Sequence, residues 1–202
     1  MHDLFIQADP KKVCEIGVFV PEYCKSKYFI NKGIKTILIE ANPLCIKYIK
    51  EEFGSKQNVE IHNKAIFDRV GEISIYNRGK SPDASAFISE FSVSPSLIND
   101  NYKKNENDKL KCEAVTFDLL DPGDIDILFL DIEGAEWYAI KNMKSRPKII
   151  SVELSGMNYI NPFKNKIENW MLENNYILLG QLDGDFIFTK QNDKLQSLQS
   201  KN

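Results

Sequence analysis

Residues 125–137 read IDILFLDIEGAEW, and this stretch decides how the rest of the chain is interpreted. It opens with five apolar residues in six positions, a pattern typical of a strand buried on both faces of a parallel sheet. The apolar run stops at Asp131, and Glu133 and Glu136 follow around a turn that Gly134 permits. Because ligands bind beyond the carboxyl ends of parallel strands, these carboxylates are expected at a functional site. The alternative is that Asp131 caps the turn and that Glu136 only complements the dipole of the next helix.

The composition is that of an ordinary globular protein. The chain has 202 residues, of which 43% are hydrophobic and 27% charged, and this length is enough for one domain with its own core. The net charge of −3 gives no basic field, so we predict no nucleic-acid partner. The four cysteines form no C-x-x-C pair and the two histidines lie far apart in the sequence, so no metal site is predicted.

Segments that would direct the chain to a membrane are not found in the sequence. Residues 1–12, MHDLFIQADPKK, carry two aspartates and no long apolar core, unlike a signal peptide. No apolar run reaches the length of a transmembrane helix. We therefore expect a cytoplasmic protein without a membrane partner.

Hydrophobic periodicity and turn residues divide the chain into alternating strands and helices. Strands are predicted at 13–19, 35–40, 58–68, 71–79, 112–120, 125–130 and 146–153, and helices at 22–33, 44–54, 135–144 and 165–175. Two final strands, 176–182 and 185–190, flank Asp183-Gly184, a strong hairpin signal. Alternation of this kind implies right-handed crossovers and a parallel sheet. We predict an α/β, Rossmann-like fold with helices on both faces of a mostly parallel sheet and an antiparallel C-terminal hairpin.

One long segment interrupts the alternation. Residues 77–111 are rich in Ser, Asn, Lys and Asp and contain two prolines, and a loop of that length is usually functional or disordered. We predict a single domain over residues 13–190, preceded by a short extension, 1–12, and followed by a polar tail, 191–202. The long segment is predicted to be a loop that orders over the acceptor site when ligands bind.

Carboxylates near the first two strands indicate a nucleoside-containing cofactor. Glu40 ends the second strand, 23 residues after Gly17, where an acidic residue commonly accepts hydrogen bonds from a ribose diol. The first turn, CEIGVFVPEY, has one glycine in place of G-x-G-x-x-G, and Glu15 and Glu22 would repel a pyrophosphate. They would not repel a sulfonium or an ammonium group. The electrostatics therefore favour S-adenosylmethionine over NAD.

A set of short motifs extends along most of the chain. The set consists of CEIGVFVP, ILIEANP, NKAIFDRVGEISIY, VTFDLL, KIISVEL and, most specific of all, LFLDIEGAEWYAIKNM. Together these motifs resemble the FkbM family of class I S-adenosylmethionine-dependent methyltransferases. Pro21 stands where the family pattern has its second glycine, and the region before the first strand is shorter than in many members. The resemblance implies a seven-stranded sheet with a reversed last strand.

The resemblance also implies which residues hold the cofactor. It assigns Glu15 and Gly17 to the methionine portion, Glu40 to the ribose hydroxyls, Ala41 and Asn42 to the flanks of the adenosine, and Ala65 and Ile66 to the adenine. Asp131 would lie where cofactor and acceptor meet, and Glu133 further outward.

The predicted activity is O-methylation of a small sugar-like or phosphorylated metabolite. A hydroxyl acceptor must lose its proton, and since no histidine follows the central strand, a carboxylate is the expected base, either Asp131 or Glu133. His62 lies within a predicted strand and is expected to be structural. Basic residues of the long segment either hold an anionic acceptor or form a solvated loop: Arg78, Lys80, Lys103, Lys104, Lys109 and Lys111. Further candidate contacts are Ser81, Asp83 and Ser85.

Two competing functions stay open at this point. An NAD-dependent oxidoreductase is the first, and the single glycine of the first turn counts against it. A non-catalytic S-adenosylmethionine-binding module is the second, because Pro21 and the short N-terminal region depart from the family pattern. A homodimer is an alternative to the long segment as the means of closing the site.

Overall fold

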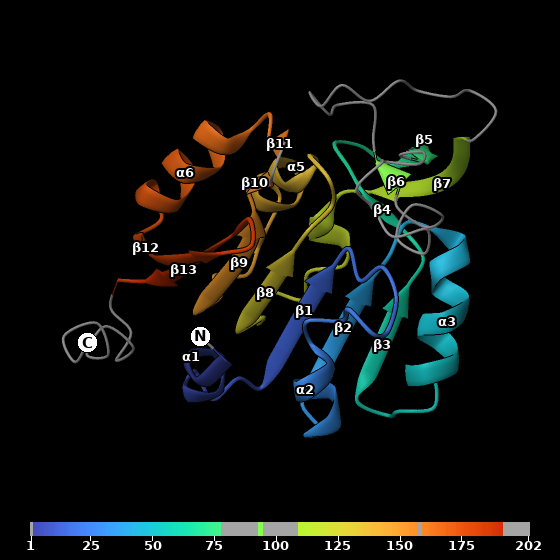
Figure 1. The fold of residues 1–202 in the computed structure, drawn as a ribbon, viewed down its shortest axis with the longest axis horizontal. Helices are drawn as coiled ribbons and strands as arrows, with labels where there is room; N and C mark the ends of the chain where they lie inside the picture. The colour runs from blue at the N-terminus through green and yellow to red at the C-terminus, as the bar shows by residue number, and fades with distance from the viewer. Residues whose placement is uncertain (1, 78–92, 95–108, 157–158, 192–202) are drawn as a thin grey trace.

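The computed structural model describes residues 2–77, 93–94, 109–156 and 159–191 (Figure 1). Its main sheet has seven strands in the order β12-β13-β9-β8-β1-β2-β3. These are β1 (Lys12–Ile16), β2 (Lys35–Ile39), β3 (Val59–His62), β8 (Ile127–Leu130), β9 (Ile149–Glu153), β12 (Tyr176–Leu182) and β13 (Asp185–Lys190). The strands from β9 to β3 pair in parallel, and β13 runs antiparallel to both of its neighbours. The predicted mostly parallel, seven-stranded sheet with an antiparallel C-terminal hairpin is therefore confirmed.

Strand β8 lies at the centre of this sheet, and all four of its residues are buried. Leu128 and Leu130 pack into one core cluster, whereas Ile127 and Phe129 pack into another. Because successive side chains of a strand point to opposite faces, β8 anchors a hydrophobic core on each side of the sheet. The apolar run has the role that the sequence predicts.

Helix α1 precedes β1, and the other described helices lie between strands along the chain. They are α1 (His2–Gln7), α2 (Lys27–Asn31), α3 (Pro43–Phe53), α5 (Glu136–Lys141), α6 (Lys164–Glu173) and the 3-10 turn η2 (Phe117–Leu119). Helix α3 begins at Pro43, one residue before the predicted bound, and carries Cys45, Ile46 and Ile49 on its buried face. Of the described helices, none is long and apolar enough to cross a membrane.

The helix predicted at 22–33 is wrong in its first half, since α2 begins only at Lys27. Residues 17–26 form loop and turns instead. The backbone N–H groups of Lys25 and Ser26 donate to the Glu15 carboxylate at 2.9 and 2.8 Å. A buried side chain from β1 thus occupies the N–H groups of this segment and holds it in a non-helical shape.

A second sheet lies beyond the carboxyl ends of β1, β2 and β3 (Figure 1). Its order is β4-β7-β5-β6, with β4 (Ala65–Ile66), β5 (Gly71–Asn77), β6 (Val93–Ser94) and β7 (Lys109–Val115). The strand predicted at 58–68 is therefore two strands, because β3 pairs with β2 and β4 pairs with β7. Between them the Asn63 amide donates to the carbonyls of Glu40 and Ala41 at 2.9 and 3.1 Å. These two bonds fix the bend between the sheets.

The segment predicted as a loop at 77–111 starts in β5 and ends in β7, which pair antiparallel. Its ends are therefore strands of the second sheet. Most of the segment, 78–92 and 95–108, lies outside the described residues, and so do the predicted site cover and the candidates Ser81, Asp83 and Ser85. The predicted polar tail, from residue 192, lies outside them as well.

The closing hairpin β12–β13 turns at Asp183 and Gly184, as predicted. Their φ angles are 48° and 97°, and two successive left-handed residues are what a two-residue hairpin turn requires. The structure adds a small two-stranded sheet, β10 (Ser155–Gly156) and β11 (Tyr159–Ile160). No sequence pattern predicted it, and it follows directly after β9 at the acidic edge of the main sheet.

Candidate active site

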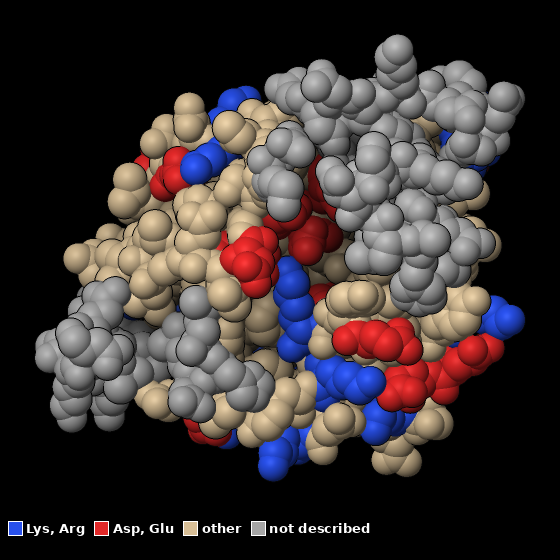
Figure 2. Space-filling view, viewed as in Figure 1, with Lys and Arg blue, Asp and Glu red and all other residues tan. Residues whose placement is uncertain are grey.

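A pocket of about 340 Å³ lies between the carboxyl ends of β1, β2 and β8 and the second sheet. That volume is in the range of small-molecule sites. Figure 2 shows acidic side chains gathered in a hollow near the centre of this face. Eight of the nine residues predicted for the site line the pocket: Glu15, Gly17, Glu40, Ala41, Ala65, Ile66, Asp131 and Glu133.

Gly17 lets the turn after β1 pack against the end of β8. Its φ is 85°, a left-handed conformation that glycine adopts without strain. A Cβ atom at this position would lie 1.7 Å from the backbone oxygen of Asp131. Only glycine therefore permits this approach, which brings the first turn and Asp131 to the same wall of the pocket.

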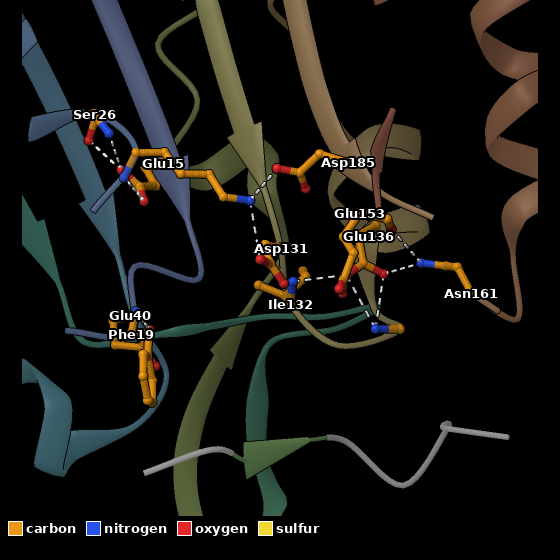
Figure 3. Close-up of polar contacts among 12 residues, drawn as sticks. Glu15, Phe19, Ser26, Glu40, Asp131, Ile132, Glu136, Glu153, Asn161 and Asp185 are labelled. Atoms are coloured by element: carbon orange, nitrogen blue, oxygen red, sulfur yellow. Dashed lines mark hydrogen bonds and ion pairs between the residues drawn. The ribbon is translucent and has the colours of Figure 1, made fainter. Parts of the chain in front are cut away.

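The Glu15 side chain lines the pocket, yet its carboxylate is bound within the protein. It accepts hydrogen bonds from the backbone N–H groups of Lys25 and Ser26 and from the Ser26 hydroxyl (Figure 3). The Cys24 thiol donates to it as well. Burial raises the pKa of Glu15. Glu15 therefore positions the loop that carries Lys25. Glu22, the other glutamate that was expected to repel a pyrophosphate, is exposed and does not line the pocket.

The Glu40 carboxylate, at the end of β2, is held by two backbone donors. Phe19 N–H donates to Oε2 at 2.8 Å (Figure 3), and Asn42 N–H donates to Oε1, also at 2.8 Å. A carboxylate offers about four lone-pair sites, so the two oxygens keep capacity for a diol. Burial raises the pKa of Glu40 to about 7. The structure places Asn42 outside the lining, where its side chain caps α3 by accepting from Leu44 N–H at 2.9 Å.

Asp131 shares a lysine with an aspartate far away in the sequence. Lys25 Nζ lies 3.2 Å from Asp131 Oδ2 and 2.7 Å from Asp185 Oδ2 (Figure 3). All three side chains are partly shielded from water, so these ion pairs are stronger than pairs on an open surface. Both carboxylates raise the pKa of Lys25 against the opposing effect of burial, and the lysine stays charged.

Glu136 is a structural residue. It is fully buried, and it accepts hydrogen bonds from Ile132 N–H at 2.8 Å, from Gly134 N–H at 3.0 Å and from the Asn161 amide (Figure 3). These bonds close the turn after β8, and burial raises the pKa of Glu136 to about 7. Glu136 lies in the first turn of α5, as the alternative reading has it, and its carboxylate binds N–H groups of the preceding turn. Glu133 lines the pocket with a left-handed φ of 55°, a conformation that costs energy for a non-glycine residue and is often found at functional sites.

Most of the residues that line the pocket were not predicted from the sequence. The missed residues are Ile16, Val18, Phe19, Tyr23, Lys25, Ile39, Lys64, Phe67, Ile73, Ile75, Ile132 and Ala135. They give the pocket a largely apolar wall, as expected for the flat rings of a nucleoside. The alternation of Ile73 and Ile75 in the 71–79 strand was the available signal for part of this wall. Nothing in the sequence marked Lys25, because its partners depend on the order of strands in the sheet.

Other residues considered at the sequence level lie away from the pocket. His62 forms a 2.7 Å contact with Glu60 on β3 and does not line this pocket. Lys111 pairs with Glu72 at 2.7 Å on the exposed surface of the second sheet. Arg78, Lys80, Lys103 and Lys104 lie outside the described residues. Within those residues, no group of three His, Cys, Asp or Glu side chains is arranged to hold a metal ion.

The chain was compared with known protein families, curated proteins and solved structures. The family model described as "Methyltransferase FkbM domain" matches residues 13–178. No curated protein matches the sequence.

Two solved structures share the fold. The methyltransferase FkbM from Methylobacillus flagellatus KT has a TM-score of 0.57 and 11% identity, over 90% of this chain and 44% of that one. A protein provisionally named as a caffeoyl-CoA O-methyltransferase from Staphylococcus aureus has a TM-score of 0.52 and 12% identity, over 93% of this chain and 78% of that one. The chain thus spans less than half the length of the first of these proteins.

Proposed function

Because the chain belongs to the methyltransferase FkbM domain family, we propose that its pocket binds S-adenosylmethionine and that it methylates a hydroxyl group of a neutral, sugar-like small molecule. Members of this family are S-adenosylmethionine-dependent methyltransferases, and membership implies binding of S-adenosylmethionine and S-adenosylhomocysteine. The observation that best supports this proposal is that the Gly17 turn, the Glu40 carboxylate and Asp131 line the same pocket wall. This arrangement fits the cofactor better than NAD.

The residues present fit the cofactor group by group. Glu40 has lone pairs left for a ribose diol after accepting from Phe19 and Asn42. The apolar residues of β4 and β5 supply a surface for an adenine ring. A pyrophosphate, in contrast, needs free N–H groups at a helix N-terminus. Here the N–H groups of Lys25 and Ser26, just before α2, are already bound to Glu15.

The charge around Asp131 narrows the class of acceptor. Asp131, Glu133 and Asp185 gather at this edge beside Glu153, and Lys25 forms ion pairs with Asp131 and Asp185. A phosphate on the acceptor would meet this excess of negative charge, whereas a neutral hydroxyl-bearing molecule would not. The acid edge therefore supports a neutral sugar-like acceptor over a phosphorylated one.

The chemistry assigned to the chain is positioning and proton removal. S-adenosylmethionine, held by the Gly17 turn and Glu40, would supply a methyl group activated by its sulfonium, with S-adenosylhomocysteine as the leaving group. Asp131 orients the acceptor hydroxyl and takes its proton, through the oxygen that Lys25 does not bind. Glu133 is the second candidate for this role, further along the same turn.

The proposal is tested by calorimetric titration followed by an activity assay. We expect S-adenosylmethionine and S-adenosylhomocysteine to bind and NAD to give no heat of binding. Release of S-adenosylhomocysteine is then measured with matched pairs such as glucose and glucose 6-phosphate or mannose and mannose 6-phosphate. Turnover with a neutral sugar and less with its phosphate is the expected result. Tight binding of NAD instead would favour an oxidoreductase, and cofactor binding without turnover on any acceptor would favour a non-catalytic module.

Glu40→Ala is expected to weaken S-adenosylhomocysteine binding by about 1–3 kcal/mol, the scale of a lost hydrogen bond to a charged group. Glu60→Ala, which removes an exposed carboxylate of β3 outside the pocket, is the matched control. A folded Glu40→Ala protein with wild-type affinity would remove Glu40 from the cofactor site.

The same residue gives a prediction for pH. Since the pKa of Glu40 is about 7, the carboxylate that accepts from the diol is lost as the pH falls through that value. Affinity for S-adenosylhomocysteine should therefore decrease from about pH 8 to about pH 6. Glu40→Gln should bind more weakly but with little change over this interval. A wild-type affinity that rises on acidification has the wrong sign for this assignment.

A further inference from the structure

Three carboxyl groups stand in a row at the ends of three adjacent strands. Leu130 of β8 is in register with Val152 of β9, so Asp131 follows beside Glu153. Glu153 in turn pairs directly with Asp185 of β13. Because residues in register on neighbouring strands point to the same face, the three carboxyl groups share one side of the sheet, with Glu153 in the middle.

The two outer members of the row have a counter-ion and the middle one has none. Lys25 bridges Asp131 and Asp185, and in the described part of the chain no ion pair reaches Glu153. The Glu153 Oε2 atom is buried and finds no hydrogen-bond partner there. Figure 3 shows Glu153 beside Glu136, another carboxyl group.

Tyr159 is a second buried side chain that no described group satisfies. The residue is 8% exposed, and its hydroxyl oxygen has no hydrogen-bond partner in the described part of the chain. The carboxyl groups that act on this hydroxyl are those of Glu136, Glu153, Glu133 and Asp131. The Tyr159 hydroxyl on β11 therefore lies near the same group of carboxyls as Glu153.

Both groups are exceptions to the pattern of this protein. The deeply buried carboxylates each accept from several N–H or hydroxyl donors, as Glu15, Glu40, Asp121 and Glu136 do. Leaving a buried polar group unsatisfied costs about 1–3 kcal/mol. Such groups call for a specific explanation, and both lie near Asp131 and Glu133, which line the pocket.

The surroundings also fix the protonation of Glu153. Burial raises the pKa of Glu153 first, and the charges of Asp131, Glu133 and Glu136, together with a side-chain hydrogen bond to Asp131, raise it further, to about 10. Lys25 forms its ion pairs with Asp131 and Asp185 and not with Glu153. At neutral pH Glu153 is thus a carboxylic acid, which can donate a hydrogen bond as a tyrosine can.

We propose that Glu153 and Tyr159 are acceptor-binding residues that donate hydrogen bonds to oxygen atoms of a neutral, hydroxyl-bearing acceptor placed beside Asp131. Asp131 can only accept, whereas Glu153 as a neutral acid and Tyr159 can both donate. A polyol hydroxyl is both donor and acceptor, so this combination satisfies it fully. The inference rests on the proposed function for the class of acceptor, while the protonation of Glu153 is independent of it.

The first experiment reads the protonation directly, on the whole chain and without an acceptor. Infrared spectra at neutral pH should contain the carbonyl band of a protonated carboxylic acid in the wild type. Glu153→Gln should lose the contribution of Glu153 to that band, and the control Glu173→Gln, at an exposed position on α6, should retain it. Identical bands in the wild type and Glu153→Gln would overturn the proposal.

Thermal unfolding gives a second reading with a defined sign. The pKa of the Glu153 carboxyl is ordinarily 4.5 and is about 10 in the folded protein. Between these two pH values the folded state therefore holds a proton that the unfolded state releases. The contribution of Glu153 to the free energy of unfolding of the wild type is therefore greatest below pH 4.5 and falls as the pH rises. Glu153→Gln removes this loss, and its Tm should exceed that of the wild type by on the order of 10 °C near pH 8 and by much less near pH 5. An equal difference at both pH values would contradict a neutral Glu153.

The acceptor role is read from binding of methyl glycosides to the chain loaded with S-adenosylhomocysteine. The probes are the methyl glycosides of glucose, galactose and mannose and their 6-phosphates, observed by saturation-transfer NMR. Glu153→Leu and Tyr159→Phe should each weaken binding of a neutral glycoside roughly tenfold, and Glu153→Gln should restore most of the loss because its amide still donates. Wild-type affinity in Glu153→Leu, preference for the phosphates, or binding of none of the neutral glycosides would overturn the proposal. If the wild type does not bind S-adenosylhomocysteine at all, the proposed function is contradicted, whatever the protonation state of Glu153.

Discussion

Gly17→Ala is expected to abolish measurable cofactor binding. The added methyl group would lie 1.7 Å from the backbone oxygen of Asp131 and 2.7 Å from its carbonyl carbon. Backbone atoms cannot rotate away as a flexible side chain can, so the turn after β1 or the end of β8 must shift. Both carry residues of the pocket. Misplacement by about an ångström costs on the order of 10²-fold in a site that depends on position. We also expect a loss of stability of about 3 kcal/mol.

Gly33→Ala provides a matched control for this change. Gly33 also has a left-handed φ, 76°, but a Cβ atom there would meet nothing within 4 Å. Its substitution therefore carries only the backbone strain of a non-glycine residue, about 1–2 kcal/mol. Chemical denaturation and titration with S-adenosylhomocysteine on both variants separate strain from collision. If Gly17→Ala retains wild-type affinity, the close contact between the first turn and β8 is unimportant for the site.

The fold was predictable where local signals and global structure agree. The run at 125–130 is buried on both faces in β8, and Asp183-Gly184 turns a hairpin because both residues accept a left-handed backbone. The second sheet was not predictable in this way. Residues 58–68 read as one strand, since nothing local shows that Ala65 and Ile66 pair with a strand some fifty residues later. Only the Asn63 contacts with the end of β2 mark the change of sheet.

The site was predictable as a set of positions but not as a set of contacts. Strand ends and the family motifs located Gly17, Glu40 and Asp131 at the pocket. They did not show that the Glu15 carboxylate accepts hydrogen bonds from the backbone of the loop before α2. Nor did they show that Asp185 lies near Asp131, because that depends on β13 pairing with β9 in reverse. A strand that ends in a carboxylate next to the central strand was the available signal for Glu153.

Asp131→Asn is expected to lower turnover by about 10²–10⁴-fold, the range of general base catalysis, while cofactor affinity changes little. Asparagine keeps the shape of the side chain but cannot take up the acceptor's proton. The assay uses S-adenosylhomocysteine release with whichever neutral glycoside binds the wild type, and titration with S-adenosylhomocysteine measures affinity. Glu133→Gln tests the second candidate on the same turn. The residue that serves as base should show the larger loss in turnover, without a matching loss in binding.

A complication is that Asp131→Asn also breaks an ion pair with Lys25, and this loss alone would disturb the site. Asp185→Asn is the control, because it removes the other carboxylate from the same lysine at 2.7 Å and does not line the pocket. If loss of the ion pair were the cause, both aspartate variants would be impaired to a similar degree. If Asp131 is the base, Asp185→Asn should lose less than about tenfold. Full turnover in both Asp131→Asn and Glu133→Gln would exclude a carboxylate base, and methyl transfer would then depend on positioning of the acceptor alone.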